Sequence, residues 1–334
     1  MYKLTDIKRL EVEPTNLCQA RCPQCMRTPL DGSMNKDLND TLELDVFKNI
    51  PDSFWQQLES INFNGTTGDC MAHKDIASII EYIRARTSAR ISLHTNGGLG
   101  TRETWVRLAN ILKESDRVVF GIDGIGVTNQ LYRVGVNFDH ALTNAEIFIQ
   151  SGGSAEWQYI AFRHNEQYIS KARSMSESSG FKKFTVRNSG RFDSQGITKV
   201  YINGKQSHII EKSTIHVDNN EPERRTDITS TCIDCESIKT KWLAIYADGT
   251  VWPCCHLMGW HKTHHFGISA LVNKKLEEVI GDYSVINLHH HSLESIINSP
   301  VFQHRYKDSF ESNRPIPICI SECRVDVQNK RPYS

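Results

Sequence analysis

An excess of either charge is missing from this sequence of 334 residues, in which 39 Lys and Arg balance 39 Asp and Glu. Without a net field, no large electrostatic surface is expected for nucleic acid or an anionic membrane, which argues against a dedicated nucleic-acid-binding module. Long hydrophobic runs are missing too, and the N-terminal region lacks the apolar core of a secretion signal. These absences exclude a membrane-spanning segment and predict a cytoplasmic location.

Cysteine, by contrast, is abundant, because the chain has ten cysteines and they stand in tight groups. In a chain without an export signal, such grouping favours metal ligation in a reducing cytoplasm over disulfide bonds. The length is sufficient for one large domain and one small one.

Three of these cysteines, Cys18, Cys22 and Cys25, lie on one short stretch directly after a strand-like run. Thiolates are the usual ligands of iron–sulfur clusters, and a cubane has four irons, so three thiols leave one iron open to a small molecule. A structural zinc site would need a fourth Cys or His nearby, and none follows before Cys70 and His73. The spacing alone leaves zinc or unliganded thiols as alternatives.

Up to about residue 190, β-rich runs alternate with amphipathic runs of helical spacing, which predicts parallel strands wrapped by helices. Strands are expected at Arg9–Asn16, Glu59–Asn64, Arg90–Thr95, Arg117–Ile122, Ala155–Phe162 and Lys183–Arg187. Helices are expected at Asp75–Arg86, Arg102–Glu114, Asp139–Gln150 and Glu166–Ser178. These strands are too few for a closed eight-stranded barrel.

A strand that leads into a C-x3-C-x2-C loop resembles the radical S-adenosylmethionine (SAM) superfamily. The resemblance implies an α/β fold with a partial (β/α)6 TIM-like barrel and chemistry at the carboxyl ends of its strands. It also implies a [4Fe–4S] cluster with three Cys ligands, which reductively cleaves SAM to a 5′-deoxyadenosyl radical that abstracts a substrate hydrogen. One departure is that Gln24 and Met26 flank Cys25, where the family often has an aromatic residue.

Several loop residues match positions that contact SAM in this family. Gly65, Thr66, Gly68 and Asp69 stand where the family has a Gly-Gly-Glu-Pro-like segment, and Asp69 is expected to pair with the SAM ammonium group. The other expected cofactor-binding residues are Asn96 in a Thr-Asn-Gly motif, Asp123 at the pocket rim, Arg133 as a grip for a carboxylate, and Gln158 in the barrel lumen. Plain polar turns, an exposed arginine and a structural hydrogen bond are the alternatives, and the catalytic acid or base is unknown.

The C-terminal part holds six more cysteines in the pattern Cys232-x2-Cys235, Cys254-Cys255 and Cys319-x3-Cys323. The stretch Trp242–Pro253 reads as a β-hairpin that turns at Asp248-Gly249. With Cys254 it resembles the C-x(9–15)-G-x4-C signature of the SPASM and twitch extensions, which implies a small α+β domain with one auxiliary [4Fe–4S] cluster. The expected ligands are Cys232, Cys235, Cys254 and Cys323, with Cys319 competing for one place and Cys255 a bystander. A four-thiolate zinc ribbon is the alternative.

We therefore expect a radical SAM barrel at residues 1–191, a bridging segment at 192–231 and an auxiliary-cluster domain at 232–334. The bridge is polar, is strongly charged over Asp218–Asp227, and has a hairpin turn at Asn203-Gly204.

The expected activity is oxidation or bond formation on a peptide or protein, assisted by the auxiliary cluster. The same chemistry on a sugar or amino-alcohol, or a non-catalytic zinc-stapled binding protein, are the alternatives. A flavodoxin or ferredoxin is expected as the reductant. Cys18 lies too near Met1 for a leader-binding domain ahead of the barrel. A peptide would therefore be recognised by the barrel mouth, by a partner protein, or by an edge strand at Lys199–Asn203.

Overall fold

The computed structural model describes residues 2–29, 31–215, 232–263, 269–311 and 315–325. The charged stretch Asp218–Asp227 of the expected bridge lies outside the described residues. None of the described helices is long and apolar enough to cross a membrane.

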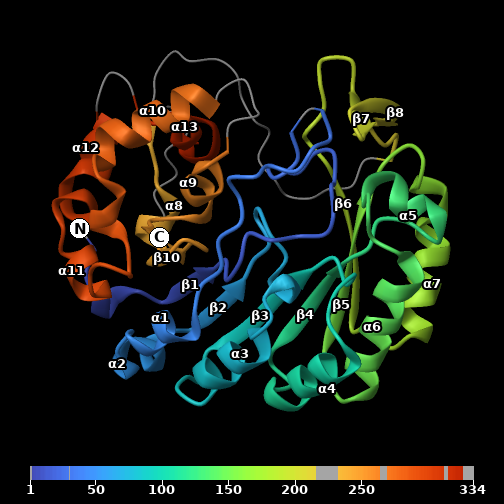
Figure 1. Ribbon diagram of the computed structural model, residues 1–334, viewed down its shortest axis with the longest axis horizontal. Coiled ribbons are helices and arrows are strands. Elements are labelled where there is room, and N and C mark those ends of the chain that lie inside the picture. The colour runs from blue at the N-terminus through green and yellow to red at the C-terminus, as the bar shows by residue number, and fades with distance from the viewer. Residues whose placement is uncertain (1, 30, 216–231, 264–268, 312–314, 326–334) are drawn as a thin grey trace.

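Six parallel strands form the centre of the molecule in sequence order, and their sheet stays open (Figure 1). They are β1 (Arg9–Val12), β2 (Ser60–Phe63), β3 (Arg90–Thr95), β4 (Arg117–Gly121), β5 (Ala155–Ala161) and β6 (Lys183–Asn188). The predicted partial barrel is confirmed. Strand β1 is shorter than expected, and Pro14, which has no amide hydrogen to donate to a ladder, follows its end closely.

Helices cover one face of this sheet (Figure 1). The predicted ones form as α3 (Ile76–Arg84), α4 (Arg102–Ile111), α6 (Phe138–Gln150) and α7 (Ile169–Ser178). The helix-facing core is aromatic: Phe120 of β4 packs against Trp105 of α4 with ring centroids 5.3 Å apart, and Trp157 of β5 packs against Phe181 at 5.3 Å. Because side chains alternate along a strand, the polar residues between these core positions line the inner face. The short helices α1 (Leu44–Lys48), α2 (Asp52–Gln57) and α5 (Val127–Tyr132) were not predicted.

The predicted hairpin of the C-terminal part forms, but it does not stand apart from the barrel. Its first strand, β10 (Trp242–Ile245), pairs in parallel with β1, and β11 (Val251–Trp252) pairs antiparallel with β10. The turn depends on Gly249, whose φ of 87° favours glycine. The hairpin thus extends the barrel sheet to eight strands in the order β11-β10-β1-β2-β3-β4-β5-β6.

Short helices around this hairpin complete the C-terminal part, on one side of the molecule (Figure 1). They are α8 (Glu236–Lys239), α9 (Cys255–Trp260), α10 (Ser269–Ile280), α11 (Leu293–Ile297), α12 (Tyr306–Glu311) and α13 (Pro317–Cys323), with a π-helical turn at Val301–Arg305 between α11 and α12. Strands β9 (Cys232–Ile233) and β12 (Arg324–Val325) pair antiparallel and bring the two ends of this part together.

The expected bridge contains a second hairpin, formed by β7 (Ile197–Ile202) and β8 (Lys205–Glu211). Its turn is the predicted one, with φ of 52° at Asn203 and 75° at Gly204, as a two-residue hairpin turn requires. The hairpin rests against the loop that carries Cys18, Cys22 and Cys25: Gln24 of that loop donates to Thr198 Oγ1 at 2.8 Å.

Candidate functional site

The loop after β1 presents its three cysteines in a form suited to thiolates. Cys22 is buried, and Cys18 and Cys25 are half-buried. The amide of Ala20 donates to Cys18 Sγ at 3.3 Å, and the amide of Arg27 donates to Cys25 Sγ at 3.4 Å. Such N–H donors favour a negatively charged sulfur, and hydrogen bonds to sulfur are one of the features that tune iron–sulfur clusters.

The buried thiols of this loop can ionise only if a positively charged group lies among them. Burial raises the pKa of Cys18 above its ordinary value, and the charges of Asp69 and Cys22 raise it further. Burial raises the pKa of Cys22 to about 12. Buried thiols that repel one another stay protonated unless a metal centre neutralises them.

The donor set fits a cluster better than a single ion. No three of the described His, Cys, Asp and Glu side chains come close enough together to hold one metal ion. A four-iron cluster needs a wider arrangement, because each of its thiolates binds a different iron. Three thiols from one loop, two of them with amide donors to sulfur, meet that need.

Asp123 and Arg133 form an ion pair beside this loop, which corrects the expectation that Asp123 stands at a pocket rim. Arg133 Nε donates to Asp123 Oδ2 at 2.6 Å, and the Asp123 side chain is 0% exposed. Asp123 also accepts from the amide of Ile160 at 2.6 Å. Asp123 therefore lies in the interior and not at a pocket rim, and Arg133 is not a solvated surface arginine. The guanidinium acts to lower the pKa of Cys22, against the larger effect of burial.

Asp69 connects two loops at the carboxyl edge of the sheet. Its carboxylate accepts from Thr95 Oγ1 at 2.8 Å, from the amide of Asn96 at 2.7 Å and from the amide of Met71 at 3.0 Å. Both oxygens are thus used within the protein, and the side chain is buried. The structure gives Asp69 a structural role, and its pairing with SAM stays a prediction.

The remaining expected SAM-binding residues lie near the same edge. Asn96 accepts from Gln19 at 2.7 Å, and its amide nitrogen lies 3.6 Å from Cys18 Sγ. Gly68 is required by packing, because a Cβ there would lie 2.1 Å from the Thr15 carbonyl oxygen at the start of the cysteine loop. Gly65 is exposed and Thr66 half-buried in the same turn. Gln158 alternates with the buried Trp157 and Tyr159, so it lies on the inner face of β5.

Two buried carboxyls on the inner face of β1, Glu11 and Glu13, were missed by the sequence analysis. Glu11 accepts from Asn62 at 2.9 Å, and one oxygen of Glu13 accepts from the amides of Thr67 and Gly68, both at 2.6 Å. Burial raises the pKa of each to about 7. The alternation Leu10-Glu11-Val12-Glu13 was the available signal, because it places both carboxyls on the face opposite the core.

A second group of thiols forms in the C-terminal part. Cys319 and Cys323 lie one turn apart on α13, and Cys254 ends the β10–β11 hairpin. A hydrogen bond from Cys323 lowers the pKa of Cys235 below its ordinary value, and burial raises the pKa of Cys254 to about 12, with the charge of Cys235 contributing. The structure thus brings Cys235, Cys254, Cys319 and Cys323 together. Cys232 begins β9, but its side chain lies outside the described part.

Cys255 is the first residue of α9 and is half-buried. Burial raises the pKa of the Cys255 thiol above its ordinary value, and the charge of Glu11 raises it further. The expected role of Cys255 as a bystander to the auxiliary cluster stays a prediction. None of the nine cysteines with described side chains forms a disulfide.

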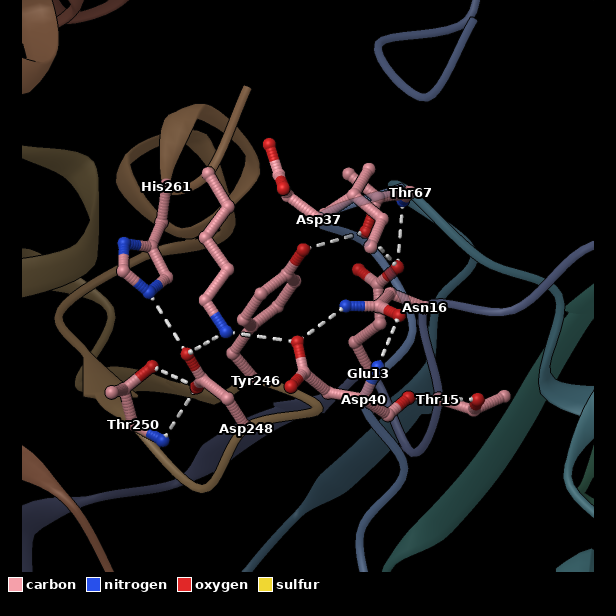
Figure 2. A network of polar contacts seen from close by, with 12 residues as sticks. Glu13, Thr15, Asn16, Asp37, Asp40, Thr67, Tyr246, Asp248, Thr250 and His261 are labelled. Carbon is pink, nitrogen blue, oxygen red and sulfur yellow. Dashed lines mark hydrogen bonds and ion pairs between the residues drawn. The ribbon is translucent and has the colours of Figure 1, made fainter. Parts of the chain in front are cut away.

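A polar network joins the two thiol-bearing regions (Figure 2). Lys262 Nζ lies 2.9 Å from Asp40, which follows the cysteine loop, and 3.1 Å from Asp248 at the hairpin turn. Asn16, just before Cys18, donates to Asp40 at 2.9 Å, and His261 lies 2.9 Å from Asp248. Although burial acts in the opposite direction, His261 and Lys262 hold the pKa of Asp248 well below its usual range.

Comparison with known proteins shows which families and structures this chain resembles. Residues 232–324 match the SPASM family, described as an iron–sulfur cluster-binding domain. The fold is similar to SuiB of Streptococcus suis bound to its precursor peptide SuiA, with 12% identity, coverage of 94% of this chain and 76% of SuiB, and a TM-score of 0.55. It is also similar to anSMEcpe with bound AdoMet (SAM), with 13% identity, coverage of 94% and 87%, and a TM-score of 0.52. No curated protein sequence matches the chain.

SuiB and anSMEcpe are radical SAM enzymes. The chain therefore shares its fold, a partial barrel with an open sheet, with these enzymes, and its residues 232–324 match the SPASM family.

Proposed function

We propose that this chain is a radical SAM enzyme that acts on a peptide or protein, with an auxiliary cluster in its SPASM domain. The observation that carries the proposal is the pair of thiol groups: Cys18, Cys22 and Cys25 at the carboxyl end of β1, and Cys235, Cys254, Cys319 and Cys323 around the hairpin next to β1. When bound, the first cluster supplies an electron for SAM cleavage and hydrogen abstraction from the substrate.

The chain's own residues hold and orient these groups. Cys18, Cys22 and Cys25 would hold three irons of the first cluster and would leave the fourth iron open for SAM. The half-buried Arg133 and the amide donors to sulfur offset the negative charge of the thiolates. Glu13 fixes the turn that holds Gly68 against the cysteine loop, so the SAM-binding edge and the cluster share one framework.

A peptide substrate is supported by two proteins of similar fold. SuiB was solved with its precursor peptide SuiA, and anSMEcpe with the Cp18Cys peptide. The second of these structures covers 91% of this chain at 14% identity with a TM-score of 0.53. A flavodoxin or ferredoxin would supply the electron. The auxiliary cluster would accept the electron that the substrate radical loses when it is oxidised, or would assist bond formation.

Anaerobic reconstitution of the full chain tests the proposal. Two clusters predict about eight irons and eight sulfides per chain and a brown colour from thiolate–iron charge transfer. With dithionite and SAM, 5′-deoxyadenosine should form. The triple variant Cys18→Ala, Cys22→Ala, Cys25→Ala should keep about four irons and lose that activity. A colourless protein that contains zinc, or 5′-deoxyadenosine formation in the triple variant, would overturn the assignment.

A further inference from the structure

Three buried aromatic rings, those of Tyr2, Phe302 and Tyr306, pack against one another in a row. Tyr2 meets Phe302 edge to face, with ring centroids 5.5 Å apart at 82°, and Phe302 meets Tyr306 at 5.5 Å and 80°. Tyr2 is 3% exposed and Tyr306 1% exposed. Gln303 donates to the Tyr2 carbonyl at 2.7 Å, which fixes the N-terminal segment against this layer.

The two tyrosine hydroxyls in this layer differ in their partners. The Tyr2 hydroxyl lies 3.3 Å from Ser237 Oγ, which in turn lies 3.2 Å from Cys235 Sγ. The Tyr306 hydroxyl is buried and has no hydrogen-bond partner among the described residues. Buried hydroxyls in folded proteins are almost always paired, so an unpaired one marks a place where a further group binds.

The electrostatic surroundings of Tyr306 indicate the kind of group that its hydroxyl meets. Burial raises the pKa of the Tyr306 hydroxyl well above its ordinary value, and the charges of Cys254 and Cys319 are among the other causes. The hydroxyl therefore keeps its proton and lies within electrostatic range of two thiols of the auxiliary group. The Tyr2 hydroxyl is already paired with Ser237, whereas the Tyr306 hydroxyl is unpaired within the part of the chain that the structure describes.

We propose that the Tyr306 hydroxyl donates a hydrogen bond to a sulfur of the auxiliary cluster and thereby raises the reduction potential of that cluster. This inference rests on the auxiliary cluster of the proposed function. A hydrogen bond to sulfur stabilises the reduced state, because that state carries more negative charge. Tyr306 is thus a tuning residue that sets how readily the cluster accepts an electron from the substrate side.

The test is a redox titration of the auxiliary cluster in the full chain, in which the EPR signal of the cluster is recorded at each potential. It uses the Cys18→Ala, Cys22→Ala, Cys25→Ala background, so that only one cluster contributes. Tyr306→Phe should make the midpoint potential more negative at unchanged iron and sulfide content. Tyr2→Phe is the matched control, because it removes a hydroxyl that reaches the thiols only through Ser237, and it should shift the potential less. A potential unchanged in Tyr306→Phe would overturn the proposal.

A second variant keeps the ring and the hydroxyl in case Tyr306→Phe loads no cluster. Tyr306→3-fluorotyrosine has a more acidic phenol and is a stronger donor, so the potential should become less negative. An unchanged potential in this variant would also overturn the proposal. If the parent chain binds no second cluster, the auxiliary part of the proposed function fails and this inference fails with it, whereas a loaded cluster with equal potentials refutes Tyr306 alone.

Discussion

At the scale of single residues, Asp69 and Arg133 show how burial changes an interpretation based on motifs. The sequence places both after strand ends, where SAM-binding residues of similar proteins stand. In the structure, each is engaged inside the protein, Asp69 with Thr95 and the amide of Asn96, and Arg133 with Asp123. A motif indicates that a carboxylate or guanidinium is needed at an edge of the sheet, but the surrounding donors and acceptors determine what it pairs with.

The variant Asp69→Ala should weaken SAM binding by roughly 1–3 kcal/mol, the cost of losing hydrogen bonds to a charged group. Because Asp69 also holds the amide of Asn96, the free energy of unfolding should fall together with the affinity. Isothermal titration with SAM and chemical denaturation measure the two effects. The control Asp75→Ala, on an exposed turn, should change neither. Unchanged SAM affinity alongside reduced stability would leave Asp69 with its structural role only.

At the scale of elements, two roles are open to the β7–β8 hairpin: support of the cysteine loop and binding of a peptide substrate. The predicted peptide-binding edge, Lys199–Asn203, covers the end of β7 and the first turn residue. Thr198 of β7, however, binds Gln24 of the cysteine loop, and a Cβ at Gly32 would lie 2.1 Å from the Tyr201 carbonyl oxygen. The hairpin is thus part of the wall around the first cluster. An edge strand of a two-stranded sheet can still accept an extended peptide.

The variant Lys199→Pro distinguishes these two roles, because proline removes one backbone donor from the strand. If β7 binds the substrate, turnover should fall while SAM cleavage without substrate survives. The same change at Gln206 of β8 is the matched control within the hairpin. Loss of both activities in the Lys199→Pro variant would show that β7 supports the cysteine loop, and no change in either would contradict a role in substrate binding.

At the scale of the whole molecule, the inner face of the barrel makes stability depend on pH. Burial raises the pKa of Glu11 to about 7, above the value near 4.5 of an exposed glutamate, so the folded state binds a proton more tightly than the unfolded state. Stability should therefore fall as pH rises from about 4.5 to about 7. Glu11→Gln should remove this pH-dependent loss of stability, which is on the order of 1–3 kcal/mol at pH 7.

Denaturant unfolding of the metal-free chain between pH 4 and 8 measures this profile. Glu166 provides a control whose pKa is shifted in the opposite direction. Burial acts to raise the pKa of Glu166, but hydrogen bonds from Ser213 and Thr214 lower it to about 2. Its contribution is present above about pH 4.5 and is lost as pH falls toward 2. Glu166→Gln should therefore lower stability at pH 7. A profile of Glu11→Gln parallel to that of the parent chain would show that the carboxyl is not protonated in the fold.

The sequence by itself determined the fold class, because strand and helix periodicity are local: each predicted barrel strand forms, and the turns at Asn203-Gly204 and Asp248-Gly249 lie where glycine permits them. It also determined the group of Cys18, Cys22 and Cys25, because residues on one short loop stay close in space. Only the tertiary structure decided that β10 joins β1, that Cys319 lies with Cys235, Cys254 and Cys323, and that Glu11, Glu13 and Tyr306 are buried. Those features depend on contacts between residues far apart in the chain, and burial then sets which charges and donors find partners.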